Sequence, residues 1–195
     1  MIASTPKPDD MAELPLDPTG FFEFDLAQGA VRTSDGRRTL VLSEQAVARL
    51  VTTAVEAGDL TAVRVLGSEL GELAERALPG SGSAVDQTPA GVFGAAAAVV
   101  ALYGWGRLSA ERWGPAVVLE VTGAAPLDSD HLACAALLGG LFSRLSGSEV
   151  ACVPVTEAGR YLMVDPGIAE RIWNWSREGD DLGVILSKLE PAGAG

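Results

Sequence analysis

The sequence predicts an α+β domain, in which an antiparallel sheet of three to five strands carries helices packed on one side. Two observations predict this class. Apolar residues recur at helical spacing through residues 43–78. The second half of the chain, from Trp113 to Val164, then reads strand, helix, strand, strand, and this order fits a helix-backed antiparallel sheet.

The length of the chain suits a single domain. Its 195 residues are enough to bury a core without disulfides, and 48% of them are hydrophobic. Residues 1–18 are acidic and rich in proline, so we expect a flexible lead-in there. We expect residues 19–190 to form the domain and residues 191–195 to form a flexible tail.

The first strands are expected directly after the lead-in. Phe21–Leu26 alternates between apolar and polar residues and then reaches Gln28-Gly29, a turn signal. Val31–Thr33 and Thr39–Leu42 flank a second turn at Asp35-Gly36. These segments predict a hairpin ahead of the first helix.

Three helices are expected next. Ser43 is a favourable cap for the first helix, which Gly58 ends. The second is predicted over Leu60–Leu78 and the third over Pro89–Tyr103. The third helix contains Ala95–Ala98, which are small enough to let another helix or a sheet approach closely.

The second half of the chain supplies the rest of the sheet and two further helices. Strands are predicted at Trp113–Val121, Glu149–Val155 and Arg160–Val164, and helices at Asp128–Leu145, Gly167–Arg177 and Leu182–Leu189. Asp128 or Ser129 is the expected cap of the first of these helices.

Charge and hydropathy exclude several classes of protein. The net charge is −12 and no window is rich in lysine and arginine, so we expect no nucleic-acid binding. The longest apolar run, near Ala90–Tyr103, is too short to span a bilayer. The amino terminus lacks the pattern of a signal peptide. We therefore expect a cytoplasmic protein without membrane insertion.

The sequence offers few residues for catalysis or metal binding. It has two cysteines and one histidine, with no metal-ligand spacing and no phosphate-binding glycine loop. Cys134 with His131, three residues earlier on the same helical face, is the best catalytic pair available. A capping or surface role for His131 and a buried role for Cys134 are the alternatives. We expect no enzyme activity, metal or cofactor.

Several segments in the order just described resemble the 4-vinyl-reductase domain family. Its fold is shared by sensor domains of aromatic-responsive regulators and by TRAPP subunits of vesicle tethering. The matching segments, within about residues 40–165, are Tyr103-Gly104-Trp105-Gly106, Ala116–Val121, Cys134 through Gly139-Gly140 to Leu145-Ser146-Gly147, Glu149–Val155, Glu157-Ala158-Gly159 and Tyr161–Val164. Metal-binding members carry cysteines around the closing strands, and Val155–Val164 has none.

The resemblance implies two kinds of function. A TRAPP-like member would be an interaction module, an adaptor or scaffold in a bacterial cytoplasmic assembly, dimeric through the helices of residues 43–78. A vinyl-reductase-like member would be a sensor domain that binds an apolar or aromatic ligand, here without metal. On that alternative the candidate ligand residues are Cys134, Gly139, Gly140 and Trp105, although the double glycine also suits close helix packing.

The candidate residues for a protein partner are two tryptophans and two leucines. Trp173 and Trp175 lie two positions apart on a predicted helix, so their rings cannot share one face, and tryptophan is enriched at binding hot spots. The alternative is that they seal the domain. Leu66 and Leu70 lie on the apolar face of the second helix. The interaction module, with a homodimer or other protein partner, is the first hypothesis and the ligand sensor the second.

Overall fold

The chain folds into two antiparallel sheets and six α-helices among the residues described. The computed structural model describes residues 18–78, 84–114, 116–125, 127–155 and 159–189, so most of the predicted lead-in and tail and part of the turn at residues 157–159 lie outside it. The elements are β1 (Phe22–Asp25), β2 (Ala30–Thr33), β3 (Arg38–Thr39), α1 (Glu44–Glu56), α2 (Thr61–Ala77), the 3₁₀ turn η1 (Ala84–Asp86), α3 (Pro89–Leu102), β4 (Arg107–Trp113), β5 (Ala116–Thr122), α4 (Leu132–Ser146), β6 (Ala151–Pro154), β7 (Arg160–Val164), α5 (Pro166–Arg177) and α6 (Leu182–Leu189).

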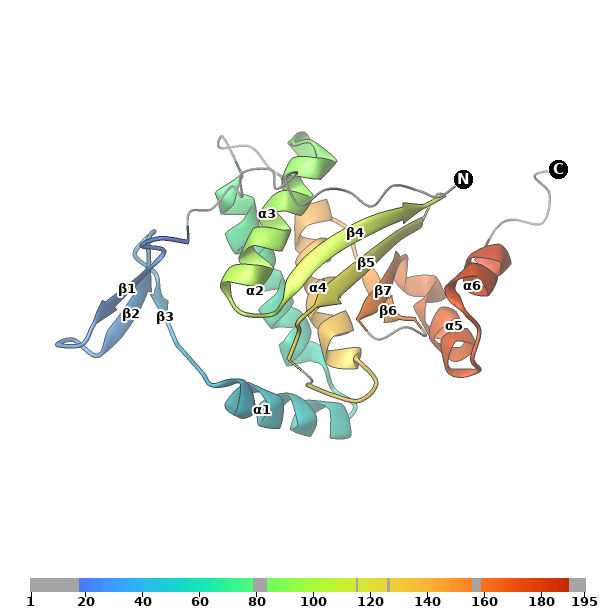
Figure 1. Ribbon diagram of the computed structural model, residues 1–195, viewed down its shortest axis with the longest axis horizontal. Coiled ribbons are helices and arrows are strands. Elements are labelled where there is room, and N and C mark those ends of the chain that lie inside the picture. The colour runs from blue at the N-terminus through green and yellow to red at the C-terminus, as the bar shows by residue number, and fades with distance from the viewer. Residues whose placement is uncertain (1–17, 79–83, 115, 126, 156–158, 190–195) are drawn as a thin grey trace.

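The α+β class and the antiparallel sheet predicted from the sequence are confirmed. The main sheet has four strands in the order β4-β5-β7-β6, and every neighbouring pair is antiparallel. A smaller sheet, β1-β2-β3, stands apart at one end of the molecule (Figure 1). Strand β4 is an addition to the predicted elements, because the first strand predicted in this half of the chain begins only at Trp113.

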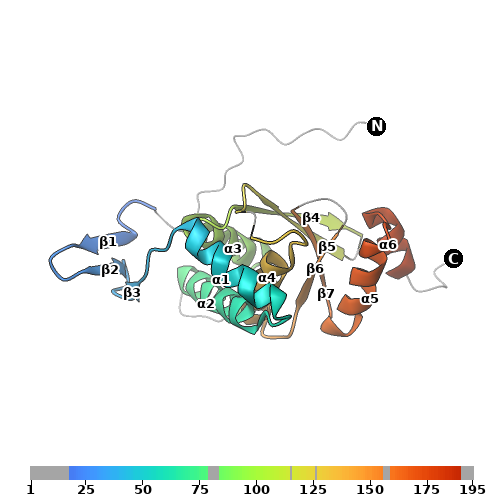
Figure 2. The same ribbon diagram turned by 90° about the horizontal axis from the view of Figure 1, so that it is seen from below.

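Helices cover both faces of the main sheet, and the prediction of helices on one side is wrong. In β7, Tyr161 and Met163 pack into a core with α2, α3 and α4. The alternate residues Leu162 and Val164 pack into a second core with α5 and α6. The strand is apolar at consecutive positions, so both of its faces need cover. Figure 2 shows the resulting order of helix layer, sheet and helix pair.

Helices α2 and α4 cross at very short range. A Cβ atom built on Gly67 would lie 1.9 Å from the carbonyl oxygen of Leu137, and one on Gly140 would lie 2.0 Å from that of Arg64. Only glycine permits backbones to approach so closely. The close-packing interpretation of the double glycine therefore holds at Gly140.

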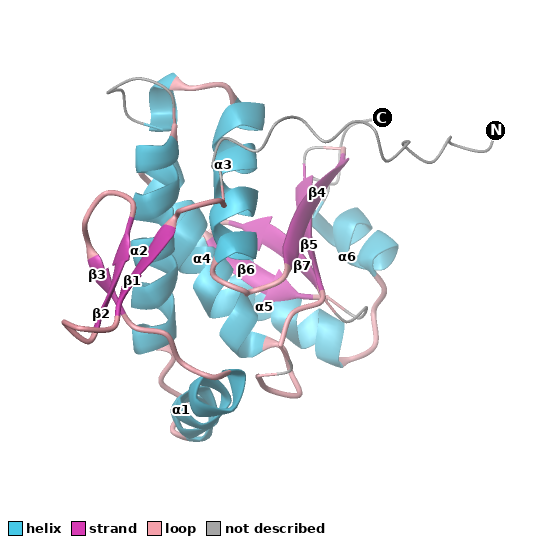
Figure 3. Cartoon of the chain, turned by 60° about the vertical axis from the view of Figure 1, so that its left-hand side comes forward, coloured by secondary structure: helices cyan, strands magenta, loops and turns pink. Residues whose placement is uncertain are grey.

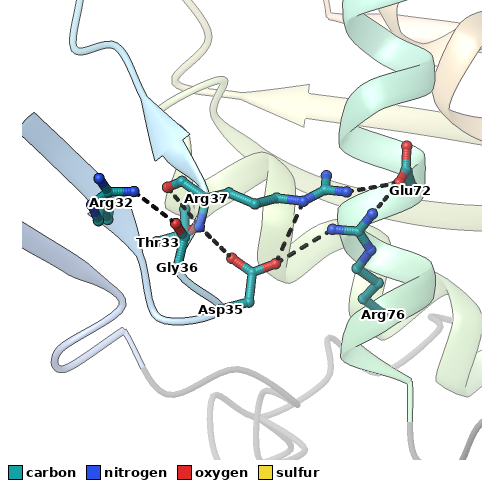
Figure 4. A network of polar contacts seen from close by, with 7 residues as sticks. All are labelled: Arg32, Thr33, Asp35, Gly36, Arg37, Glu72 and Arg76. Atoms are coloured by element: carbon teal, nitrogen blue, oxygen red, sulfur yellow. Dashed lines mark hydrogen bonds and ion pairs between the residues drawn. The ribbon is translucent and has the colours of Figure 1, made fainter.

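The small β1–β3 sheet is held against α2 by ion pairs (Figures 3 and 4). The Arg37 guanidinium lies 3.2 Å from the Glu72 carboxylate, and Arg76 contacts both Glu72 and, at 3.4 Å, Asp35. A hydrogen bond from Thr33 lowers the pKa of Asp35, and one from Arg37 lowers the pKa of Glu72. These side chains are largely exposed, so the network orients the sheet more than it stabilises the fold.

An exposed segment and a lightly packed helix follow this sheet. Ser43 caps α1 by accepting a hydrogen bond from the Ala46 amide at 3.3 Å, as the sequence predicted. Val51 is the one buried residue of α1. Helix α1 lies at the edge of the helix layer, near the beginning of α2 (Figures 1 and 2).

Candidate functional site

An apolar pocket of about 500 Å³ lies between the main sheet and the ends of α3 and α4. We call it the sheet-face pocket. The strand register forms its floor: Arg112, Val117 and Met163 stand side by side across β4, β5 and β7, and Ala110 stands beside Leu119. The small side chain of Ala110 leaves space above the strands.

Two aromatic rings line the pocket from the helix layer. Phe93 of α3 and Phe142 of α4 stack with their centroids 6.3 Å apart and their planes 12° from parallel. Leu145 and Val92 add aliphatic surface from the same helices. The volume falls within the range of about 300–1,000 Å³ that is typical of small-molecule sites. The pocket can hold an apolar or aromatic group.

The polar groups of the sheet-face pocket lie mainly on β4. The Arg112 Nε donates to the carbonyl oxygen of Gly114 at 3.2 Å. The Glu111 carboxylate accepts a hydrogen bond from Trp113 Nε1 at 3.1 Å and lies 3.5 Å from the Arg160 guanidinium. Glu111 and Arg112 alternate along β4, so the Arg112 side chain leaves the strand on the pocket side and that of Glu111 on the opposite face.

A second hollow, of about 320 Å³, lies between α2 and α4, but its charged groups already serve the fold. The Arg64 guanidinium donates to Ser143 Oγ at 2.9 Å and to the Val150 carbonyl at 3.0 Å, and pairs with Glu149 at 2.5 Å. These bonds join α2 to the turn between α4 and β6. We therefore interpret the hollow as the edge of the contact between α2 and α4, and not as a ligand site.

The two thiols are held in protonated form. Cys134 is half-buried and Cys152 is buried. Burial raises the pKa of Cys134 to about 11, although a hydrogen bond with Tyr161 opposes the shift, and burial raises the pKa of Cys152 to about 12. A nucleophilic cysteine needs the opposite shift. The nucleophile hypothesis for Cys134 gains no support from this environment.

His131 and Asp128 have different roles at the start of α4. The Asp128 carboxylate accepts hydrogen bonds from the amides of Leu132 at 2.8 Å and Ala133 at 2.9 Å, so it caps the helix with its side chain, but the prediction that Asp128 or Ser129 is the N-cap residue is wrong. His131 occupies the cap position itself, with a left-handed φ of 58°, and its side chain makes no capping bond. The pKa of Cys134 is shifted by burial, by Tyr161 and by Asp128, and His131 is not among these causes. The predicted pair of Cys134 and His131 therefore gains no support.

Alkylation of the folded protein by iodoacetamide at pH 8 is expected to be at least about 100-fold slower than alkylation of free cysteine. A thiol of pKa about 11 is only about 0.1% ionised at that pH, against about a quarter for an unperturbed thiol. Mass spectrometry of the labelled chain measures the rate, with guanidinium-unfolded protein as the control. Rapid labelling of Cys134 in the folded chain would contradict this account of its surroundings.

The four predicted ligand residues lie away from the described lining of the sheet-face pocket. An added Cβ atom at Gly140 would meet the α2 backbone at Arg64, and one at Gly139 would meet the Arg64 side chain and the Val150 carbonyl oxygen. Trp105 is half-buried beyond the end of α3, and Cys134 lies deeper along the sheet face; both pack against the first core. Their ligand-binding role stays a prediction, and the geometry favours packing.

The predicted partner residues separate into exposed and buried ones. Leu66 is 39% exposed, but Leu70 is 2% exposed and belongs to the core, so its assignment to a partner surface is wrong. Trp173 and Trp175 are both half-buried against the second core. Each ring also carries a cation, with Lys188 Nζ 5.1 Å from the centroid of Trp175. The sealing role of the tryptophans is thus the better supported one.

The residues that form the pocket were missed because they gather from distant parts of the chain. Phe93, Phe142 and Met163 each read as ordinary core positions within their own helix or strand. One signal was available: Arg112 is one of three charged residues, with Arg107 and Glu111, in the segment directly before an apolar strand. Because β4 was not predicted, the sequence did not show that Arg112 lies on a strand beside the pocket.

Comparison with known proteins supports the fold. No model of a protein family matches the sequence, and no curated protein matches it. Among solved structures, the chain is similar to the phenol-responsive sensory domain of the transcription activator PoxR, solved with phenol. The two share 16% sequence identity with a TM-score of 0.55, over 78% of this chain and 91% of that one. At this identity the likeness shows the fold alone.

Within the described ranges, no three histidine, cysteine, aspartate or glutamate side chains gather as a metal-ligand set would. Among the helices described, none combines the length and the apolar character needed to cross a membrane.

Proposed function

We propose that this protein is a small-molecule-binding domain whose ligand is apolar or aromatic and binds without a metal. The observation that carries the proposal is the sheet-face pocket, with its apolar floor and its stacked Phe93 and Phe142. The fold that it shares with a phenol-responsive sensory domain supports the same proposal. A sensory role would follow if ligand binding changes how the domain meets a partner.

Binding of naphthol, a neutral aromatic probe, is expected to depend on free space above Ala110. Ala110→Trp would place an indole in the pocket and raise the Kd at least about tenfold, equivalent to about 1.4 kcal/mol. Isothermal titration calorimetry measures the Kd. Ala101→Trp, at an exposed position of α3 outside the described pocket lining, is the control. Absence of binding to the wild type, or equal binding by Ala110→Trp, would sink the proposal.

A second candidate function is self-association, the interaction hypothesis drawn from the sequence. Its specific support is an exposed apolar run between β3 and α1: Leu40 is 79%, Val41 68% and Leu42 55% exposed, and Leu50 of α1 is 67% exposed. Contiguous exposed apolar residues mark interaction surfaces more often than isolated ones do. We propose a second copy of this chain as the occupant.

Light scattering at micromolar concentration is expected to give the mass of a dimer for the wild type and of a monomer for Val41→Asp, because a buried unpaired carboxylate is costly. Leu26→Asp is the matched control, since Leu26 is 90% exposed at the tip of the small sheet. A monomeric wild type, or a Leu26→Asp variant that dissociates equally, would remove the dimer. A wild-type monomer that binds a different protein would favour the adaptor hypothesis over self-association.

A further inference from the structure

The sheet-face pocket has a cationic group at its edge, the Arg112 guanidinium, that has no counter-ion among the described residues. Among the described residues, no carboxylate lies within 4.0 Å of the Arg112 guanidinium, whose one hydrogen bond runs from Nε to Gly114. Its two terminal nitrogens thus have no hydrogen-bond partner in the described part of the chain. By contrast, Arg64 and Arg144 at the second hollow are both paired with glutamates.

The nearest carboxylate of the pocket lining is already committed elsewhere. Glu111 alternates with Arg112 along β4, so the two side chains leave the strand on opposite faces. The Glu111 carboxylate is compensated by Arg160 and Trp113, at 3.5 and 3.1 Å. Among the described lining residues, Arg112 therefore carries the uncompensated charge on the pocket side of the strand.

The strand register places Arg112 beside the apolar floor, with its guanidinium held at the β4–β5 turn by the Gly114 carbonyl. Arg112 pairs with Val117, which pairs in turn with Met163, so the arginine continues a row whose other members are apolar pocket residues. A ligand lying along that row would have its apolar body over Val117 and Met163 and one end at the guanidinium. An arginine fork matches a carboxylate with two parallel hydrogen bonds.

We infer that the ligand class of the sheet-face pocket is an apolar or aromatic carboxylic acid, bound with its carboxylate at Arg112. The inference rests on the proposed function and names its ligand. The overall charge of −12 gives no long-range attraction for an anion, so selectivity must arise at contact distance. Because Arg112 is exposed, the pair is screened, and we expect a preference that weakens at high salt.

Calorimetry at low salt with two matched probes tests the inference. Naphthoate is expected to bind the wild type about five- to tenfold more tightly than naphthalenemethanol, its neutral analogue. Arg112→Gln, which keeps a donor and removes the charge, is expected to reduce this ratio to about one. Arg107→Gln is the control, because Arg107 is an exposed arginine of the same strand outside the described pocket lining.

The outcomes distinguish failure of the carboxylate assignment from failure of the proposed ligand site. A wild type that binds both probes equally, or an Arg112→Gln variant that keeps the preference, overturns the carboxylate assignment. If naphthalenemethanol still binds and Ala110→Trp blocks it, the pocket proposal stands in that case. If neither probe binds the wild type, both fall together. A preference that Arg107→Gln also abolishes points to general charge and overturns the role of Arg112.

Discussion

Replacing Gly140 by alanine is expected to lower the free energy of unfolding by at least about 2 kcal/mol. The added methyl group would lie 2.0 Å from the Arg64 carbonyl oxygen and 3.0 Å from the Ser68 amide nitrogen, both backbone atoms of α2. Neither atom can rotate away, so the helices must separate and the core between them must loosen. Chemical denaturation followed by circular dichroism measures the loss.

Two other glycines make matched controls for this experiment. At Gly139 the nearest atom is the Arg64 Nη1, at 2.6 Å, and the nearest backbone atom is the Val150 carbonyl oxygen, at 3.3 Å. The Arg64 side chain can shift only by disturbing its hydrogen bonds to Ser143 and Val150, so the alanine variant should lose stability, but less than Gly140→Ala. At Gly94 of α3 an added Cβ meets nothing within 4 Å, and alanine should raise stability by up to about 1 kcal/mol through its helix propensity. Equal stability of the Gly140→Ala and Gly94→Ala variants would contradict the tight crossing.

Truncating Ile172 to alanine is expected to cost about 2–4 kcal/mol and to loosen the α5–α6 pair. Ile172 is fully buried in the second core, together with Leu162 of β7 and Ile185 of α6. Trp173 and Trp175 pack against the same core, so their fluorescence should shift to the red as the pair opens. Denaturant titration followed by tryptophan fluorescence measures both effects.

The control for the second core is Val184→Ala. Val184 lies on α6 but is 39% exposed, so its truncation should change stability by less than about 1 kcal/mol. If Ile172→Ala behaved like Val184→Ala, the outer helix pair would not be an integral layer of the fold. A loss at Ile172 without a fluorescence shift would show that the pair stays docked although weakened.

The helices could be predicted from the sequence because each carries its own signal. Ser43 caps α1, Pro89 opens α3 and Asp165 precedes Pro166 at the start of α5, and the observed bounds follow these residues closely. The strands β5 and β7 were predictable for a similar reason, since short apolar runs bounded by turn residues usually form strands. Local chemistry decides these elements.

Strand β4 and the outer helix layer could not be predicted in the same way. Arg107–Trp113 is an edge strand with mostly exposed side chains, and an edge strand needs no apolar alternation. The side on which α5 and α6 would pack depended on the second apolar face of the sheet, which is visible only once Leu162 and Val118 are known to share it. The pocket likewise depends on tertiary arrangement.

The crossing of α2 and α4 also has a consequence for how the chain reaches its native state. Arg64 and Ser143, hydrogen-bonded across it, are 79 residues apart in the sequence. Closing so long a loop is slow and entropically costly, whereas the β4–β5 hairpin pairs neighbouring residues and can form early. During synthesis, the apolar faces of α2 and α3 stay exposed until α4 has left the ribosome and can pack against them. The nascent chain is therefore most exposed to aggregation before Leu145 emerges.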